Sequence, residues 1–237
     1  TDLGNYVITD QATTTAEITA KSVTVSGITG VGREYDGSTV ITLDGSGAVF
    51  TDIVSGDDLN VTSATGALVD KTVATAKSVA LRSPQSGGTD IGNYVITDQA
   101  TTTAVITARN ITITAPSVTK VYDGNNGIAA TAAQLQNWSN ELGVTGDTVT
   151  AISLNYNDKN VGTDKAITPS AISVTDGNGG GNYNITFAND NTSSITRLGS
   201  VMWIGGTTGD WSDPANWAGG AIPDLANVAN VVIPNGV

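Results

Sequence analysis

Three tryptophans near the end of the chain are the side chains best suited to hold a ligand. Trp203, Trp211 and Trp217 stand close together in a chain of 237 residues with only 5% aromatic side chains. Flat indole faces can stack on sugar rings, so these three residues are candidate ligand-binding residues for a polysaccharide. The alternative is that they pack against one another as a small hydrophobic core between modules.

Three aspartates that follow glycines are candidate calcium ligands. Asp57, Asp58 and Asp147 offer the carboxylate oxygens that hard cations prefer. Their spacing matches neither an EF-hand loop nor a glycine-rich nonapeptide repeat, and the alternative is that they are turn residues of hairpins. Apart from this calcium site we expect no metal and no cofactor.

Two tyrosines each precede an Asp-Gly pair, Tyr35 and Tyr122. They could face a ligand, but we favour a structural role in which each closes a strand and Asp-Gly supplies a turn with positive φ. The glycine-rich run from Asp176 to Gly181 is predicted to be a flexible loop.

The composition excludes most catalytic and several binding functions. The chain has no Cys and no His, which removes thiol nucleophiles, zinc thiolate sites and the commonest general base. Carboxylate pairs remain, but none is distinguished by its setting, so we expect no enzyme. A net charge of −12 disfavours nucleic acid as a partner. No stretch approaches the roughly 20 apolar residues of a membrane span, so we expect no membrane insertion.

Internal repeats in the sequence indicate which domains position these residues. The stretch TDLGNYVITDQATTTAEIT at residues 1–19 returns at residues 89–107 with two differences, and GNYNIT at residues 181–186 is a third, diverged copy. Three further markers recur in the same order and at nearly constant spacing, which indicates duplicated domains. These markers are Tyr-Asp-Gly at residues 35–37 and 122–124, Gly-Asp at 56–57 and 146–147, and Asp-Lys at 70–71 and 158–159.

Apolar and polar residues alternate within each copy, as they do in antiparallel strands with one buried face. The residues expected to face the core are Val23 and Val25; Ile111 and Ile113; Ile152, Leu154 and Tyr156; and Tyr183, Ile185 and Phe187. A short helix is one interpretation of residues 129–142, ending at Gly143. The motif Asp-x-Gly-x-Tyr at residues 2–6 and 90–94 predicts a tyrosine corner, with Ile8 and Ile96 in the core.

The predicted fold class is all-β, with tandem immunoglobulin-like antiparallel β-sandwich repeats; β-grasp-like repeats are the alternative. We divide the chain into the C-terminal strands of a preceding repeat (1–19), two complete repeats (20–107 and 108–197) and a tryptophan-containing linker that starts a further β-rich module (198–237). We expect the chain to be a segment of a longer protein. The junctions at residues 18–23 and 106–111 hold no Gly or Pro, which predicts limited bending and an elongated scattering profile.

With these markers the chain resembles YDG-type repeats, which are related to the MBG-type bacterial immunoglobulin-like repeats, over roughly residues 1–197. Such repeats occur in large filamentous-haemagglutinin-like adhesins, often exported by two-partner secretion. The resemblance implies a non-catalytic stalk or adhesive repeat region at the bacterial cell surface or outside the cell. It would act in cell adhesion and biofilm cohesion, and it brings no catalytic residues.

The remaining expectations concern partners. We expect the parent protein to bind surface polysaccharide or other cells. We also expect tandem contacts between domains of the same chain. A polysaccharide-binding module is the first alternative function. A self-assembling extracellular fibre subunit, formed by association of exposed edge strands, is the second.

Overall fold

The computed structural model describes residues 3–7 and 9–236, with the side chain of Ser83 excepted. Asp2 and Ile8, which the tyrosine-corner motif placed in the first copy, lie outside the described residues. The chain divides into two compact units, and each is described by itself. The first unit comprises residues 1–31, 39–69 and 76–104, and the second comprises residues 32–38, 70–75 and 105–237.

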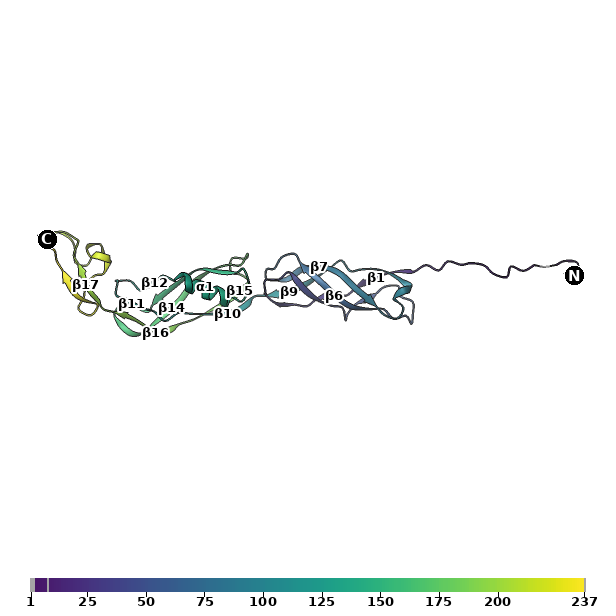
Figure 1. Cartoon of the computed structure of the whole chain (residues 1–237), viewed down its shortest axis with the longest axis horizontal. Helices are drawn as coiled ribbons and strands as arrows, with labels where there is room; N and C mark the ends of the chain where they lie inside the picture. The colour runs from purple at the N-terminus through teal and green to yellow at the C-terminus, as the bar shows by residue number, and fades with distance from the viewer. Residues whose placement is uncertain (1–2, 8, 237) are drawn as a thin grey trace. The chain divides into compact units, whose positions relative to one another are not determined.

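The first unit is built from two β-sheets that enclose its core. One sheet has the strand order β5-β1-β8, and the other runs β2-β4-β6-β7-β9. Long antiparallel strands β6 and β7 lie side by side in the second of these sheets (Figure 1). The strands are β1 (Lys21–Ser26), β2 (Thr29–Gly30), β4 (Val40–Asp44), β5 (Val49–Phe50), β6 (Asn60–Leu68), β7 (Ala74–Gly87), β8 (Tyr94–Thr97) and β9 (Thr101–Thr107).

Alternation of side chains fills the core of the first unit as the sequence predicts. Val23 and Val25 of β1 are buried between exposed neighbours, and so are Ile41 and Leu43 of β4. Gly66 of β6 lies against Val79 and Ile41, and a Cβ atom there would collide with the Val79 side chain. The side chains of the neighbouring strands β4 and β7 can therefore pack over β6 at this point, because residue 66 has no side chain.

The second unit has a related arrangement of strands and an added helix. A two-stranded sheet pairs β10 (Arg109–Thr114) with β15 (Tyr183–Ala188), and a five-stranded sheet has the order β11-β16-β14-β13-β12. Strand β3 (Arg33–Glu34) also belongs to this unit and pairs with the end of β9. The five-stranded sheet consists of β11 (Thr119–Val121), β12 (Gly127–Ile128), β13 (Thr148–Tyr156), β14 (Gly162–Thr175) and β16 (Asp190–Thr196).

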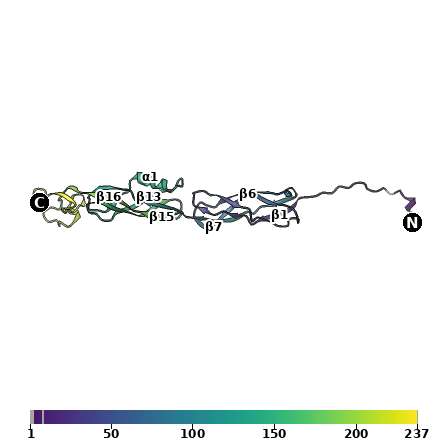
Figure 2. The ribbon, with the colours of Figure 1, turned by 90° about the horizontal axis from the view of Figure 1, so that it is seen from below.

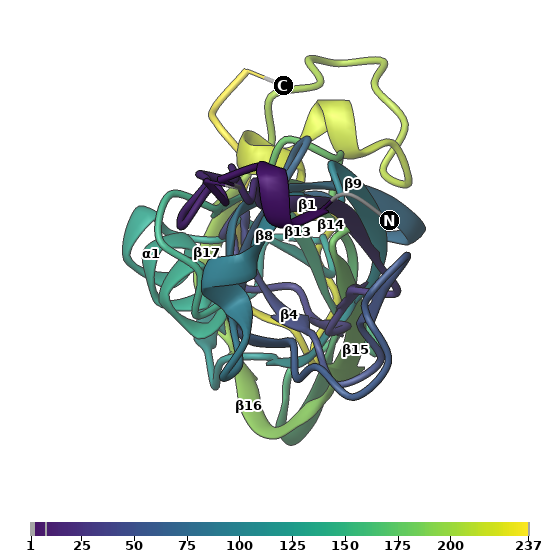
Figure 3. The same cartoon turned by 90° about the vertical axis from the view of Figure 1, so that its right-hand side faces the viewer.

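Helix α1 (Ala132–Glu141) confirms the helix expected in this region. Thr131 and Gln134 form a capping box at its start, and Gly143, with φ of +67°, follows its end. Trp138 is buried, and Ser139 accepts a hydrogen bond from the backbone N–H of Val149 at 2.8 Å, which ties the helix to β13. Figures 2 and 3 show α1 on the outside of the sheet that contains β13.

The strand pairing corrects the expectation of purely antiparallel sheets. Pairs β6–β7, β13–β14 and β14–β16 are antiparallel, whereas β1–β8 and β10–β15 are parallel. These parallel partners are the first and late strands of one repeat, so the body of the repeat supplies the long crossover that a parallel pair needs. Ile152, Leu154 and Tyr156 are buried on one face as predicted, but Phe187 of β15 is 40% exposed.

The C-terminal segment also belongs to the second unit. Strand β17 (Leu198–Met202) pairs in parallel with β18 (Val228–Val232). The 3-10 turns η3 (Pro214–Asn216) and η4 (Ala218–Gly220) lie between these strands. Across the described residues, no helix is long and apolar enough to cross a membrane.

Two nearly identical stretches of sequence adopt different structures. Both begin with a 3-10 turn, η1 (Leu3–Asn5) and η2 (Ile91–Asn93). Residues 94–107 then form β8 and β9, whereas residues 9–20 form no regular element and are exposed. Strand β8 exists through its pairing with β1, about seventy residues earlier in the chain, and residues 9–20 have no such partner among the described residues.

Candidate functional site

A buried carboxylate, that of Asp147, is the centre of the candidate site in the second unit. Its side chain is only 1% exposed. The hydroxyl groups of Tyr35 and Tyr183 donate to its Oδ2 at 2.8 Å and 2.7 Å, and Lys71 Nζ donates to its Oδ1 at 2.8 Å. A carboxylate that is removed from water needs such charge-assisted hydrogen bonds, because an unpaired buried charge is very costly.

Three short elements bring these donors together. Strand β3 places Tyr35, whose backbone N–H donates to Thr107 O at 2.9 Å, and Tyr183 begins strand β15. Lys71 lies in the turn between β6 and β7, where Asp70 accepts from the backbone N–H of Thr72 at 2.7 Å. The two tyrosine rings meet edge to face with centroids 5.5 Å apart, which fixes both hydroxyls toward the same oxygen.

The local sequence explains the turn that carries Tyr35. We call residues 35–37, and likewise residues 122–124, the Tyr-Asp-Gly turn. In both turns the aspartate accepts a hydrogen bond from the backbone N–H two residues later. Gly37 and Gly124 both have φ of +78°, a value that disfavours residues with a Cβ atom. The predicted strand-closing role of Tyr35 and Tyr122, followed by a positive-φ glycine, is therefore confirmed.

Burial and hydrogen bonding raise the pKa values of all three donors. Burial, and then the hydrogen bond to Asp147, raise the pKa of Tyr183, and burial also raises the pKa of Tyr35. The hydrogen bond to Asp147 raises the pKa of Lys71. All three groups thus hold their protons more firmly than free side chains do, which stabilises the arrangement of donors around the carboxylate.

A buried asparagine, Asn182, completes the site beside the carboxylate. Its Oδ1 accepts from the backbone N–H of Val73 at 3.0 Å and from Asn178 Nδ2 at 3.0 Å. Asp176 holds this asparagine by accepting from the backbone N–H groups of Asn178, Gly180 and Asn182. Although burial opposes it, these backbone donors lower the pKa of Asp176. The glycine-rich run is therefore an ordered loop, which corrects the expectation of a flexible one.

All the repeated sequence markers meet at this one site. Tyr-Asp-Gly and Asp-Lys come from the earlier copy of the markers, and Gly-Asp and Gly-Asn-Tyr come from the later copy. We name the acceptor face by its residues Val144, Asp147, Asn182 and Tyr183. The turns that contact this face are the Tyr-Asp-Gly turn and the Asp-Lys turn, the latter defined as residues 70–73 and again as residues 158–161.

The predicted tyrosine corner is replaced by a bond to an aspartate. Tyr94 Oη donates to Asp57 Oδ2 at 2.6 Å, and the backbone N–H of Val54 donates to the same hydroxyl at 3.0 Å. Tyr183 donates to Asp147 in the same way. The hydroxyl therefore bonds to a distant turn of the same sheet sandwich, about 40 residues earlier, instead of to the backbone just upstream.

The later Tyr-Asp-Gly and Asp-Lys turns contact the C-terminal segment in a related way. Asn227 Oδ1 accepts from the backbone N–H of Val161 at 2.7 Å, as Asn182 does from Val73. Tyr122 Oη donates to Ile222 O at 3.3 Å. A buried asparagine that accepts from this valine N–H is thus a feature of both contacts. Only Asn182 could have been found from the sequence, because it belongs to the repeated Gly-Asn-Tyr marker.

The calcium candidates do not come together. Asp147 accepts three protein donors, Asp57 accepts from Tyr94, and Asp58 accepts from the backbone N–H of Thr89 at 3.4 Å. Within residues 3–7 and 9–236, no group of three or more metal-ligating side chains is arranged to hold an ion. Each of these aspartates lies in or beside a turn, as the alternative interpretation proposed.

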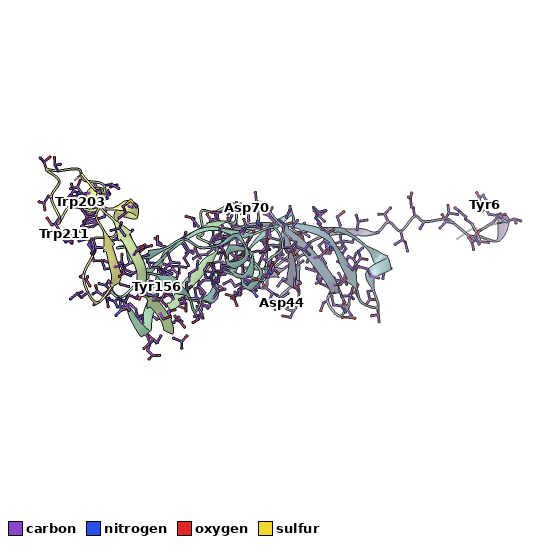
Figure 4. The ribbon with its side chains drawn as sticks, turned by 60° about the vertical axis from the view of Figure 1, so that its left-hand side comes forward. Tyr6, Asp44, Asp70, Tyr156, Trp203 and Trp211 are labelled. Atoms are coloured by element: carbon purple, nitrogen blue, oxygen red, sulfur yellow. The ribbon has the colours of Figure 1, made fainter. Side chains whose placement is uncertain are left out.

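The tryptophans form one cluster with two different environments. Trp217 is 1% exposed and Trp203 is buried, and their rings meet edge to face with centroids 4.8 Å apart. Trp211 stacks on Trp203 at 6.1 Å and is 51% exposed, and Figure 4 shows these two side chains next to each other. Trp211 also lines a hollow of about 330 Å³ together with Pro223, Leu225 and Val231.

The fold and this site define a class of all-β proteins built from tandem repeats. Two stretches of the chain, residues 19–104 and 107–193, match the YDG domain family, and together they cover well over half of its length. The chain therefore belongs to the YDG domain family, with two domains in tandem. No curated protein and no solved structure matches it.

Proposed function

We propose that this chain is a non-catalytic stalk and adhesive region of a large bacterial surface or secreted protein, of the filamentous-haemagglutinin-like kind that two-partner secretion exports. Its role would be cell adhesion and biofilm cohesion. The observation that carries the proposal is the cluster around Asp147, because its donors and its acceptor come from successive copies of the repeat markers. A contact of this kind serves to hold successive repeats of an array together.

The ionisation of the cluster supports a structural role over a catalytic one. A general acid or base works best with a pKa near the operating pH, so catalytic lysines and tyrosines have lowered pKa values. The pKa values of Lys71, Tyr35 and Tyr183 move upward instead, away from neutrality. These groups hold their protons as permanent donors.

The connection between strands supports limited bending. Ala108 alone separates the end of β9 at Thr107 from the start of β10 at Arg109. In addition, the backbone N–H of Asn110 donates to Glu34 Oε1 at 2.9 Å, beside this connection. A one-residue link held on both sides leaves few backbone torsions free to change direction.

Small-angle X-ray scattering of the 237-residue chain tests the proposal. A stalk requires an elongated particle, and it requires the Asp147→Ala variant to sample a broader range of maximum dimensions than the parent chain. The Asp98→Ala variant, which changes an exposed aspartate, is the matched control and should scatter like the parent. A compact particle would contradict the stalk function.

Polysaccharide binding is a second candidate function, and the exposed face of Trp211 favours it. An indole that is half exposed beside a hollow offers a flat apolar surface to a sugar ring, while Trp203 and Trp217 hold it from behind. Proline and leucine at the rim of the hollow extend this apolar surface. The size of the hollow, about 330 Å³, lies within the range of small-ligand sites.

A glycan array separates the two functions. Binding by the parent chain that is lost in Trp211→Ala and retained in Tyr6→Ala, a change at another exposed aromatic residue, would establish a polysaccharide module. Trp217→Ala is unsuitable as a probe because Trp217 is buried, so its removal would disrupt the cluster itself. Absence of binding to any glycan would leave the stalk function as the better account.

A further inference from the structure

The first unit contains a second acceptor face with the same construction. The backbone N–H of Asp57 donates to Val54 O at 3.1 Å, as that of Asp147 does to Val144 O at 3.3 Å. Gly56 and Gly146 have φ of +101° and +92° in these two turns. Tyr94 donates to Asp57 as Tyr183 donates to Asp147. We name the residues Val54, Asp57, Asn93 and Tyr94 the open acceptor face.

Exposure shows how the two faces differ. Val54 is 50% exposed, whereas Val144 is 7% exposed. Asn93 is exposed, whereas its counterpart Asn182 is completely buried. Among the described side chains that donate to these carboxylates, Asp57 receives Tyr94 alone, while Asp147 receives two tyrosines and a lysine. The open acceptor face thus lacks counterparts of the two turns, containing Tyr35 and Lys71, that cover the acceptor face.

The acceptor face in the second unit shows which residues make the covering contacts. Gly37 of the Tyr-Asp-Gly turn lies against Val144 so closely that a Cβ atom would press on the valine methyl group. Tyr35 and Lys71 donate to Asp147, and the backbone N–H of Val73 donates to Asn182. These contacts pair one lysine with one carboxylate and place the glycine of a turn on a valine.

The open acceptor face has room for the same turns. A hollow of about 220 Å³ is lined by Val54, Asp57, Asn93 and Tyr94, together with residues 18–21. Both Tyr-Asp-Gly turns of this chain are already engaged, Tyr35 with Asp147 and Tyr122 with Ile222.

We propose that the open acceptor face binds the Tyr-Asp-Gly and Asp-Lys turns of another YDG domain. That domain's tyrosine and lysine donate to Asp57, its glycine covers Val54, and its Asp-Lys turn presents a backbone N–H to Asn93. The inference rests on the proposed stalk function and names the partner that extends the array.

Residues 1–19 offer a way to join the proposed partner domain to the chain. They repeat residues 89–107 with two differences, and residues 94–107 form the last strands of the first YDG domain. A domain placed ahead of residue 1 would supply partner strands for residues 6–19, which have none among the described residues. It would also carry its Tyr-Asp-Gly and Asp-Lys turns to the open acceptor face, just as residues 20–107 carry theirs to Asp147.

The test uses the full chain extended at its N-terminus by a second copy of residues 20–88, so that residues 1–19 complete the added domain. Hydroxyl-radical footprinting with mass spectrometry measures the oxidation of Val54 and Val144 in the original and extended chains. We expect the oxidation rate of Val54 to fall severalfold in the extended chain, toward that of Val144. Val144 serves as the internal control and should be protected in both chains.

A matched pair of variants gives a second measurement. Asp57→Ala should lower the thermal unfolding midpoint of the extended chain by several degrees, the effect that we also expect of Asp147→Ala, and should change that of the original chain much less. The added copy with its tyrosine replaced, Tyr35→Phe at the duplicated position, should remove most of this difference. Asp98→Ala is the control for a surface aspartate.

The outcomes separate this inference from the proposed function. Equal oxidation of Val54 in both chains, with Val144 still protected, would overturn the inference and leave the Asp147 contact intact. Rapid oxidation of Val144 in the original chain, with no effect of Asp147→Ala, would overturn both the inference and the proposed function.

Discussion

The side chains of Tyr35 and Tyr183 meet edge to face, with their ring planes at 80°, and their hydroxyl groups donate to the same oxygen of Asp147. One of these tyrosines precedes the repeated Asp-Gly pair and the other ends the repeated Gly-Asn-Tyr marker. Two of the markers that recur along the chain thus supply hydrogen-bond donors to one carboxylate.

The hydroxyl of Tyr35 should contribute measurably to stability. Tyr35→Phe keeps the ring against Tyr183 but leaves Asp147 Oδ2 with one donor, and we expect the free energy of unfolding to fall by about 1–2 kcal/mol. All four tryptophans, Trp138 among them, lie in the second unit, so tryptophan fluorescence during guanidinium denaturation reports on this unit. Tyr6→Phe, at an exposed tyrosine, is the control, and equal effects of the two variants would contradict the prediction.

Alkaline pH should weaken the second unit. The pKa values of Tyr183, Tyr35 and Lys71 are raised on folding, so the stability they contribute is fully present below the unfolded values of 10.0 and 10.5 and is lost as the pH rises through the folded values. We expect the free energy of unfolding to be level from about pH 7 to 9 and to fall above about pH 10. Tyr35→Phe should reduce the slope above pH 10, and an unchanged slope would show that Tyr35 does not contribute.

Acid should weaken the loop that holds Asn182. The pKa of Asp176 is lowered in the folded chain because its carboxylate accepts three backbone N–H groups, despite its burial. Its contribution is therefore present above the unfolded pKa of 3.8 and is lost as the pH falls through the folded value. Asp176→Asn should lower stability at pH 7 and flatten its decline below about pH 4, as followed by tryptophan fluorescence. A parallel decline in both proteins would be inconsistent with this role.

Local pattern was sufficient to predict the repeats, most of the buried strand faces and the helix, but not the site. Period-two alternation places Val23 and Ile152 correctly because burial of one sheet face is a local property of each strand. The partner of a tyrosine hydroxyl is not local, and so the predicted corner at Tyr94 was wrong. The same limit explains residues 9–20 and 94–107, whose similar sequences form strands only where a distant partner strand is present.

Residue type alone did not predict which of the three tryptophans are buried. The sequence left a ligand platform and a small core as alternatives for these three residues. Trp203 and Trp217 are buried, while Trp211 keeps half of its surface exposed. Which indole is covered depends on the path of the chain between β17 and β18, where the Trp203–Trp217 bridge brings two distant backbones together. No spacing rule in the sequence encodes that path.

The close contact at Gly66 predicts a large effect of a single methyl group. Gly66→Ala places a Cβ atom against Val79 and 2.9 Å from Ile41 Cγ2, and overpacking of this kind costs about 1–3 kcal/mol. Gly92→Ala is the matched control, because nothing lies within 4 Å of the added methyl group. Amide hydrogen exchange of β6 and β7 measures the change in the first unit. Similar exchange in both variants would mean that the side chains of Val79 and Ile41 can move aside without cost.

Asn182 and Asn93 provide the sharpest comparison, because they hold the same position in successive copies of the marker. Asn182 accepts the backbone N–H of Val73 inside the acceptor face, whereas Asn93 is exposed on the open acceptor face. Asn182→Ala leaves the Val73 N–H and Asn178 Nδ2 without their acceptor, and we expect it to lower the free energy of unfolding of the second unit by about 2 kcal/mol.

Asn93→Ala should change stability by less than about 0.5 kcal/mol, as surface substitutions usually do. Asn182→Asp should not rescue the loss, because it would place a second buried carboxylate beside Asp176, whose Oδ2 lies 3.2 Å from Asn182 N. Denaturation followed by tryptophan fluorescence for residue 182, and by circular dichroism for residue 93, gives both values. If the two alanine variants lost equal stability, the asparagine would act within its own loop and not through the contact with Val73.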